Sequence, residues 1–168
     1  EIVDAAFVRG LRYFERDVLM NAFDYLKIYG YKYDGYVARI TSLQSYFDEN
    51  MKLLDDANLN ALFDAAPVYT KIRNEMPAKY GLDSKVSNSL VADGCIIEGT
   101  VENSILFRGV KVAKGAVIKD SIIMQDNYIG ENTTLNCVIT DKNVIIGNDR
   151  ELKGSDTYQV FIKKAEKV

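Results

Sequence analysis

The sequence predicts a mainly β protein organised around a left-handed parallel β-helix, and three observations in residues 86 to 147 lead to this fold class. Short units such as Ile129-Gly130-Glu131-Asn132-Thr133 combine an aliphatic residue, small residues and polar residues. Turn pairs such as Asp93-Gly94 and Lys114-Gly115 recur between them. Aliphatic residues fall six positions apart in two rows, Val117, Ile123, Ile129 and Leu135, and Leu106, Val112 and Ile118. Together these features form the hexapeptide pattern.

A period of six suits very short strands joined by tight turns, so that three flat faces close one triangular coil. The aliphatic residue points inside and stacks on its equivalent in the next coil. At about 18 residues per coil, residues 86 to 147 make roughly three to four coils. An α-helix is excluded because β-branched residues are too dense and turn pairs too frequent.

The residues before the repeat predict an α/β arrangement. An amphipathic stripe predicts a helix over Glu15 to Tyr29, and alternation of aromatic and polar residues predicts one or two strands over Tyr31 to Ile40. Thr41 and Gln44 form a capping box, which predicts a helix reaching Leu54. A further short helix is expected over residues 56 to 63, ended by Pro67, followed by a possible strand at residues 68 to 70.

The change of period divides the chain into residues 1 to 64, a linker at 65 to 85, and the β-helix domain at 86 to 168. Within the last part, Tyr158 to Ile162 has the composition of a final strand, and the Lys-rich end 163 to 168 is expected to fray. Residues 1 to 64 hold too few elements to cover a sheet, so we expect them to be the end of a larger domain. The aromatic-rich stretch 23 to 36 is then expected to be partly exposed.

Composition bounds the class of protein. The 168 residues are 48% hydrophobic and 27% charged, as in globular proteins. A net charge of -3 and the lack of a dense basic cluster give no case for nucleic acid, and no apolar run approaches the roughly 20 residues of a membrane span. The opening residues Glu1 to Asp4 contain neither a signal peptide nor an initiator Met. We therefore expect an excised part of a longer cytoplasmic protein.

Histidine and cysteine usage restricts the chemistry. The chain contains no histidine, which excludes imidazole metal sites and Ser-His or Cys-His nucleophile pairs within it. Its two cysteines, Cys95 and Cys137, both lie in the repeat where small residues are expected. We interpret them as small buried hydrophobic residues.

Three stretches resemble a known family. Residues 89 to 110, SLVADGCIIEGTVENSILFRGV, resemble the opening of the C-terminal β-helix of bacterial glucose-1-phosphate adenylyltransferase, also called ADP-glucose pyrophosphorylase. Residues 35 to 42 (GYVARITS) and 45 to 54 (SYFDENMKLL) are similar to the end of that family's nucleotidyltransferase domain. Residues 14 to 19 (FERDVL) match a segment just before it. The resemblance implies that residues 1 to 64 are the C-terminal remnant of such a domain.

One departure from the family bears on catalysis. In the catalytic subunit the segment reads Gly-Tyr-Trp-x-Asp-Val-Gly-Thr, and the resemblance implies that its Asp helps to hold the divalent metal. That Asp falls on Arg39 here, and the following Gly falls on Thr41. A guanidinium cannot ligate Mg²⁺, although it binds phosphate well, and direct phosphate binding is the alternative role for Arg39.

In this departure the sequence resembles the GlgD-type subunit, which is a companion of the catalytic subunit. Residues 143 to 147 and 151 to 154 also look GlgD-like. The resemblance implies a regulatory or oligomerisation role in ADP-glucose formation for glycogen biosynthesis. It implies no cofactor in this chain, Mg²⁺ in the intact family enzyme, and ATP and glucose 1-phosphate as its substrates. The expected partners are a catalytic adenylyltransferase subunit or a second copy, since the family is tetrameric. The family's Gly-rich nucleotide-binding signature does not occur in these residues.

Candidate site residues are few, and none is assigned as catalytic. Arg108, Lys111, Lys114 and Lys119 place positive charge on predicted turns. The resemblance implies an anionic effector site there, since family members bind sugar phosphates or nucleotides beside the β-helix, and a solvated polar corner is the alternative. Asp17 is either a polar site residue or a first-turn helix carboxylate.

Some repeat units carry two or three adjacent apolar residues, as at Leu106-Phe107 and Ile122-Ile123-Met124. One of each pair must point inward, so we expect the neighbour to pack against the N-terminal residues or another subunit. Two other functions are the alternatives. A hexapeptide acyltransferase generally relies on a histidine base, which this chain lacks, and a pure interaction module does not account for the matches in residues 14 to 54.

Overall fold

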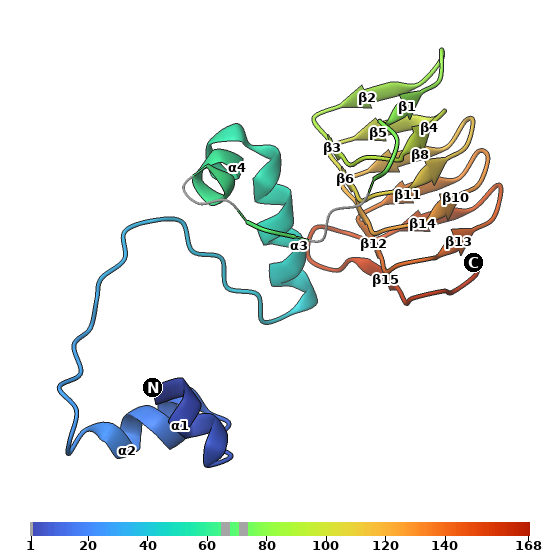
Figure 1. The fold of residues 1–168 in the computed structure, drawn as a ribbon. Coiled ribbons are helices and arrows are strands. Elements are labelled where there is room, and N and C mark those ends of the chain that lie inside the picture. Colours follow the sequence, from blue (N-terminus) through green and yellow to red (C-terminus); the bar gives the residue numbers. More distant parts are fainter. Residues whose placement is uncertain (1, 65–67, 71–73) are drawn as a thin grey trace. The chain divides into compact units, whose positions relative to one another are not determined.

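The computed structural model describes residues 2–64, 68–70 and 74–168, so Pro67 and parts of the expected linker lie outside the described residues. The chain forms two compact units, Glu1–Gly35 and Tyr36–Val168. The expected division at 64 and 85 stays a prediction. Figure 1 labels most of the elements of both units.

The first unit is helical. It contains α1 (Ile2–Val8), the π-helical segment η1 (Phe14–Leu19) and α2 (Met20–Ala22). The predicted helix is therefore confirmed up to Ala22 and wrong from there to Tyr29. Helices in proteins gain most of their stability from packing an apolar face, and Tyr29 is 83% exposed.

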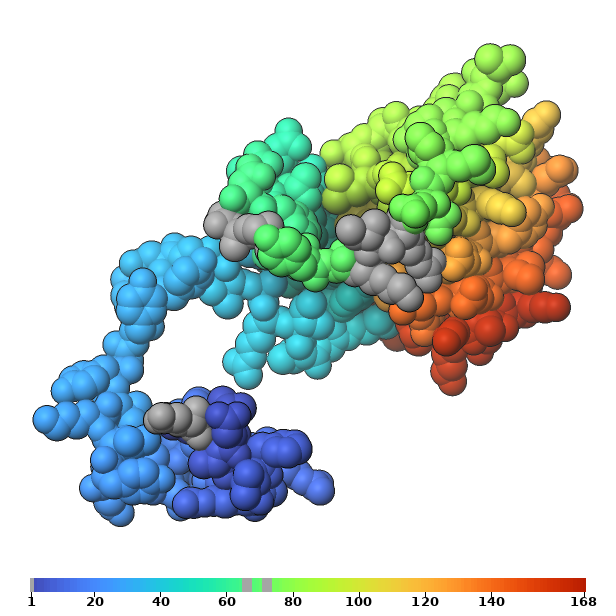
Figure 2. Space-filling view, in the orientation of Figure 1, coloured from blue at the N-terminus to red at the C-terminus, as the bar shows by residue number. Residues whose placement is uncertain are grey.

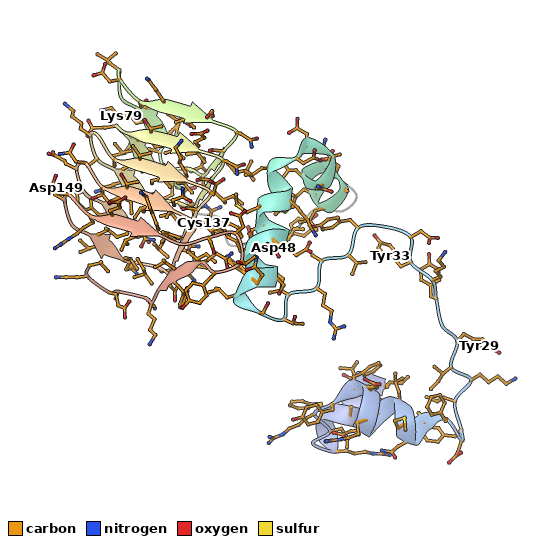
Figure 3. All side chains as sticks on the ribbon, turned by 180° about the vertical axis from the view of Figure 1, so that it is seen from behind. Tyr29, Tyr33, Asp48, Lys79, Cys137 and Asp149 are labelled. Carbon is orange, nitrogen blue, oxygen red and sulfur yellow. The ribbon has the colours of Figure 1, made fainter. Side chains whose placement is uncertain are left out.

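The stretch that follows α2 is irregular and rich in exposed aromatic side chains. Figure 3 labels Tyr29 and Tyr33 within it, and the expected exposure of this stretch is confirmed for Phe23, Tyr25, Tyr29, Tyr31 and Tyr33. The strands predicted over Tyr31 to Ile40 are wrong. No described strand pairs with these residues, and an isolated strand has no partner for its backbone hydrogen bonds. The N-terminal residues are thus helical and irregular rather than α/β.

The second unit begins with the helices α3 (Leu43–Met51), η2 (Lys52–Leu54) and α4 (Asp56–Phe63). The two predicted helices over this stretch are confirmed. The capping box is one residue later than expected, because Ser42 is the N-cap and exchanges hydrogen bonds with Ser45. Asp55 caps α4 by accepting the backbone N–H groups of Ala57 and Asn58. The possible strand at residues 68 to 70 does not form.

The rest of the second unit is a parallel β-helix, which confirms the fold class. Its fifteen strands form three five-stranded parallel sheets, here called A, B and C. Sheet A comprises β1 (Lys79–Tyr80), β4 (Ile96–Ile97), β7 (Lys111–Val112), β10 (Tyr128–Ile129) and β13 (Ile145–Ile146). Sheet B comprises β2 (Lys85–Ser87), β5 (Thr100–Glu102), β8 (Val117–Lys119), β11 (Thr134–Asn136) and β14 (Glu151–Lys153). Sheet C comprises β3 (Leu90–Val91), β6 (Ile105–Leu106), β9 (Ile122–Ile123), β12 (Val138–Thr140) and β15 (Val160–Ile162).

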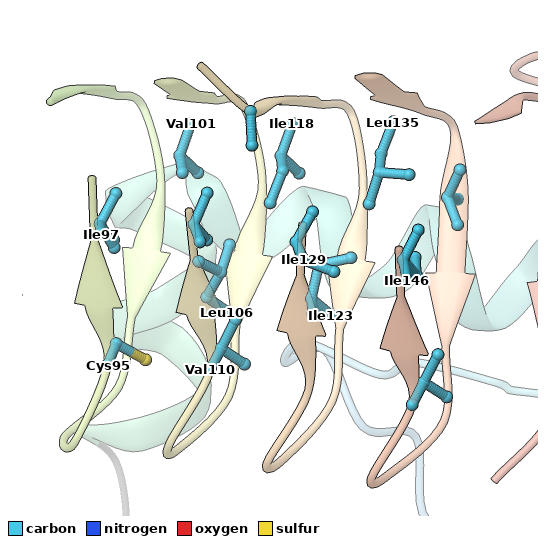
Figure 4. Close-up of a cluster of buried hydrophobic side chains, with 14 of the residues drawn as sticks. Cys95, Ile97, Val101, Leu106, Val110, Ile118, Ile123, Ile129, Leu135 and Ile146 are labelled. Atoms are coloured by element: carbon cyan, nitrogen blue, oxygen red, sulfur yellow. The ribbon is translucent and has the colours of Figure 1, made fainter. Parts of the chain in front are cut away.

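The interior is one continuous hydrophobic cluster whose side chains stack from coil to coil, as Figure 4 shows. Apart from Val117, the two rows expected from the sequence join into one series, because the step from Ile118 to Ile123 is five residues rather than six. Val117, placed in a row by the period of six, lies outside the core and is only partly buried. The strand pairing Lys111↔Tyr128 and Tyr128↔Ile145 gives a coil of 17 residues, one fewer than expected.

The five-residue step occurs at the corner between sheets B and C. One residue of each such corner has the left-handed conformation, with φ of 42° at Asn88, 48° at Asn103, 45° at Asp120 and 52° at Cys137. Asn and Asp tolerate this conformation better than other residues with a side chain. Asn88 Nδ2 donates to Asn103 Oδ1 at 2.8 Å, and Asn103 Nδ2 donates to Asp120 Oδ1 at 2.5 Å. The tight corner is thus stabilised from coil to coil.

The C-terminal end does not fray. Lys167 forms a parallel bridge with Ile145, and the Val168 N–H donates to the Ile145 carbonyl at 2.9 Å. The last residues therefore pair with the edge of sheet A, which corrects the expectation for residues 163 to 168. Pairing of an open strand edge satisfies its backbone groups.

Candidate functional site

Helix α3 packs on the outward side of sheet C, within the second unit. Phe47, which is 7% exposed, forms a cluster with Ile122 and Ile139, both fully buried. Tyr46, Met51 and Phe107 complete this cluster, here called the α3 contact. Figure 2 shows α3 lying against the β-helix. The expectation that Phe107 and Ile122 pack against the N-terminal residues is confirmed.

A corner insertion holds the start of α3. Between β14 and β15 the chain contains residues 154 to 159, and Ser155 and Tyr158 form an antiparallel bridge there. Gln44 Nε2 donates to the Asp156 carbonyl at 2.7 Å, and Gln159 Nε2 donates to Gln44 Oε1 at 3.1 Å. Sequence reasoning missed this insertion. The available signal was the run of mainly polar residues that separates Leu152 from Val160, where the other corners between sheets B and C are much shorter.

A buried serine column also escaped the sequence reasoning. Ser104 Oγ donates to the Glu102 carbonyl at 2.7 Å and accepts the Ser121 N–H at 3.1 Å. Ser121 Oγ in turn accepts the Val138 N–H at 3.1 Å. The signal in the sequence was a Ser after the left-handed Asn or Asp in three successive coils, at Ser89, Ser104 and Ser121.

The structure does not gather the four predicted cations into one patch. Arg108 lies at the corner between sheets C and A, Lys111 on sheet A, Lys114 at the corner between sheets A and B, and Lys119 on sheet B. They follow one another around a single coil rather than along successive coils. Lys119 Nζ pairs with Glu102 at 2.7 Å, and this carboxylate raises the pKa of Lys119. The anionic effector site stays a prediction.

Arg39 lies exposed in the irregular stretch before α3. Nearby, Tyr36 Oη donates to Glu49 Oε2 at 3.1 Å, and Lys52 Nζ pairs with Glu49 Oε1 at 2.7 Å. Lys52 and Tyr36 lower the pKa of Glu49, against a smaller opposing effect of desolvation. This small network ties residue 36 to the exposed side of α3.

Asp17 belongs to the first unit and acts within its own helix. Asp17 Oδ1 accepts from Arg16 Nε at 2.7 Å, and Oδ2 accepts the N–H groups of Tyr13 at 3.1 Å and Arg12 at 3.2 Å. The Arg16 hydrogen bond, followed by that of Tyr13, lowers the pKa of Asp17 to about 2. These contacts match the first-turn role weighed for this residue.

Both cysteines are buried, as expected, and neither forms a disulfide. Burial is the main cause of the raised pKa of both thiols. Cys95 Sγ donates to the Phe107 carbonyl at 3.1 Å, and Cys137 Sγ lies 3.8 Å from Asp156 Oδ1. Buried thiols with raised pKa values are poor nucleophiles, so the interpretation of small core residues holds.

The family resemblance implies Mg²⁺ in the intact enzyme, and the described residues do not fit this ion. Mg²⁺ prefers oxygen ligands, chiefly carboxylates and water. Among residues 2–64, 68–70 and 74–168, no group of three or more His, Cys, Asp or Glu side chains is arranged to hold a metal ion. The position implied for the metal-binding Asp holds the cation of Arg39.

No helix in the described parts of the chain is both long and apolar enough to cross a bilayer.

Stacked three-sided coils, an inward aliphatic row and left-handed corner residues define a hexapeptide-repeat β-helix protein. The chain belongs to the GlmU-like C-terminal hexapeptide family, whose pattern matches residues 75–159.

Three known proteins are similar in sequence to this chain. The chain is 45% identical to the glycogen biosynthesis protein GlgD of Bacillus subtilis over 140 residues, covering 83% of this chain and 41% of that protein. It is 53% identical to GlgD of Geobacillus stearothermophilus over 70 residues, covering 41% and 20%. It is 41% identical to the glucose-1-phosphate adenylyltransferase of Acetivibrio thermocellus over 124 residues, covering 73% and 29%.

The resemblance to the glucose-1-phosphate adenylyltransferase family and to its GlgD-type proteins is therefore confirmed. The chain spans less than half the length of each of these relatives.

Proposed function

We propose that this chain is a portion of a GlgD-type subunit that assists ADP-glucose formation in glycogen biosynthesis. The observation that carries the proposal is its similarity to GlgD over most of its length. The full protein would work with a catalytic glucose-1-phosphate adenylyltransferase subunit, which joins ATP and glucose 1-phosphate to give ADP-glucose and pyrophosphate. Its site of action would be the cytoplasm, where these substrates are made and used.

In this proposal the β-helix has a regulatory and oligomerising role. The α3 contact supports it, because Phe47 packs against the fully buried Ile122 and Ile139. A helix packed in this way would move together with the β-helix. Displacement of the β-helix by a partner subunit would then move α3 and the residues that precede it, including Arg39.

The proposal assigns Arg39 a role other than metal binding. Its guanidinium would repel a divalent ion, so this subunit alone would be poorly active, and Mg²⁺ would act in the catalytic partner.

We also propose the four cations of one coil, Arg108, Lys111, Lys114 and Lys119, as the region that an anionic effector such as a sugar phosphate would contact. Lys119 already pairs with Glu102, and Lys114 lies in a hollow together with Asp83 and Glu98.

The test uses the full-length form of this protein and the catalytic adenylyltransferase subunit of the same cell. ADP-glucose synthesis is measured for each alone and for the mixture, with saturating substrates and with sugar phosphates as effectors. Higher activity on mixing, with little from this subunit alone, supports the proposal. Robust activity from this subunit alone overturns it. An Arg108→Ala, Lys111→Ala variant, assayed in the mixture, is expected to lose effector response while keeping basal activation.

A further inference from the structure

One coil of the β-helix is shorter than the others at the corner between sheets A and B. The inward residues Ile97 and Val101 flank this corner and are four positions apart. At the same corner of the next two coils the inward residues are six apart, at Val112 and Ile118 and at Ile129 and Leu135. Two residues are therefore missing from the corner at Glu98-Gly99.

Gly99 makes this short corner possible. A Cβ atom added to it would lie 2.4 Å from the Ala116 carbonyl oxygen and 2.9 Å from that of Ala113. The backbone therefore approaches the next coil more closely than any other residue would allow. The turn is recessed between those of residues 81 to 84 and 113 to 116. The resulting hollow, here called the notch, has a volume of about 510 Å³.

Charged side chains converge on the notch. Asp83, Glu98 and Lys114 line it together with Leu82 and Thr100. Within the described part of the chain, none of the three charged groups forms a hydrogen bond or an ion pair. On sheet B, by contrast, Glu102 pairs with Lys119 at 2.7 Å. The notch thus presents two acceptor carboxylates, one ammonium donor and one hydroxyl group to a ligand.

The balance of charge selects the class of ligand. Two carboxylates outweigh one ammonium group, so a phosphate or another anion is repelled overall. A divalent cation is disfavoured as well, because the ammonium group of Lys114 lines the same hollow and repels it. Neutral hydroxyl groups suit the notch, because they donate to carboxylates and accept from an ammonium group.

We propose that the notch binds a neutral sugar ring of a glucan chain. Adjacent hydroxyl groups of the ring would donate to Asp83 and Glu98, and Lys114 would donate to a hydroxyl or ring oxygen. Leu82, which is 106% exposed at the rim, would contact the C–H face of the ring. The volume lies in the range of about 300–1,000 Å³ that is usual for small-ligand sites. The choice of glucose rests on the proposed function in glycogen biosynthesis, whereas recognition of a sugar ring does not.

The test is titration of the ¹⁵N-labelled chain with maltotriose, followed by NMR at the glycine amides. We expect shifts at Gly81, Gly99 and Gly115, which line the notch. Glu98→Ala and Asp83→Ala are each expected to weaken binding about tenfold, because each removes a charge-assisted hydrogen bond. The matched control is Glu131→Ala, an exposed residue at the same corner two coils on, where the spacing is six.

Three outcomes would overturn the proposal. The first is no shift of the three glycine amides with maltotriose. The second is equal weakening by Glu131→Ala. The third is tighter binding of inorganic phosphate or glucose 1-phosphate than of maltotriose, with loss on Lys114→Ala. Because no adenylyltransferase assay is involved, failure here leaves the companion-subunit proposal untouched, and failure of that proposal leaves sugar binding testable.

Discussion

Sheets B and C are built from the same coils and the same inward row, yet their outer surfaces differ completely. The outer side of sheet C carries Ile122 and Ile139, both fully buried beneath α3. The outer side of sheet B carries Glu102 and Lys119, paired with each other and open to solvent. In this fold the inward residues therefore determine the architecture, and the outward residues determine what each face contacts.

The strongest test of this comparison is a substitution in the shared interior. Ile118→Ala, at a fully buried position of sheet B, is expected to lower the free energy of unfolding by about 2–5 kcal/mol, because it leaves a cavity in a packed core. Urea unfolding followed by circular dichroism measures the loss. Thr134→Ala, pointing outward from the same sheet, is the control and is expected to change stability by less than about 0.5 kcal/mol. Equal effects would contradict the inward and outward assignment.

The outer side of sheet C should respond as a second, smaller core. Ile122→Ala is expected to cost about 1–3 kcal/mol, since α3 can partly settle into the space. Combining it with Phe47→Ala should reveal a coupling energy of about 0.5–3 kcal/mol in a double-mutant cycle. Hydrogen exchange of residues 43 to 51 should accelerate in both single variants. Strict additivity, with unchanged exchange, would mean that α3 does not rest on this sheet.

The corner between the two sheets depends on its serine column. Ser104→Ala removes the acceptor of the Ser121 N–H, and Ser104 is fully buried. An unsatisfied buried N–H costs about 1–3 kcal/mol. The exposed Ser87→Ala is the matched control, and thermal unfolding of both variants provides the measurement. A loss no larger than that of the control would show that water replaces the serine hydroxyl.

The smallest effect is expected on the outer side of sheet B. Glu102 raises the pKa of Lys119 above its ordinary value of 10.5. The contribution of this ion pair to the free energy of unfolding is therefore fully present below pH 10.5. It is lost as the pH rises through the raised pKa of Lys119. NMR titration should show this pKa returning toward 10.5 in Glu102→Gln, with no measurable change in the urea midpoint near pH 7. A clear shift of that midpoint would give sheet B a structural role that we do not assign to it.

The period of six in the sequence was enough to predict a parallel β-helix, because inward residues must be apolar in every coil. It was not enough to predict which residue of each unit points inward. Val117 and Ile118 are both apolar, and only the five-residue corner at Asp120 decides that Ile118 points inward. Asn and Asp residues in the sequence indicate where left-handed backbone can occur. The effect of such a residue on the length of a coil, however, depends on contacts between coils.

The N-terminal residues were predicted less well for a different reason. Tyr31 to Ile40 alternates as a strand does, but strand formation requires a neighbouring edge that no described residue provides. The capping box fell on Ser42 rather than Thr41 because Ser45 completes it, whereas Gln44 donates instead to Asp48 and to the Asp156 carbonyl. Of the candidate site residues, Lys114 could be located on a turn from the sequence. The corner at Glu98-Gly99 in the neighbouring coil is two residues shorter than its equivalents, and this became visible only from the stacking of coils.

The α3 contact has a consequence for the order of folding. Neighbouring strands of the β-helix mostly pair across 15 or 17 residues of chain, as in Ile96↔Lys111 and Lys111↔Tyr128. Phe47, in contrast, must find Ile139, which is 92 positions further along. Contacts close in sequence lose less chain entropy and form earlier. We therefore expect the coils to assemble by propagation from one to the next, with docking of α3 as a late event that slows unfolding more than it speeds folding.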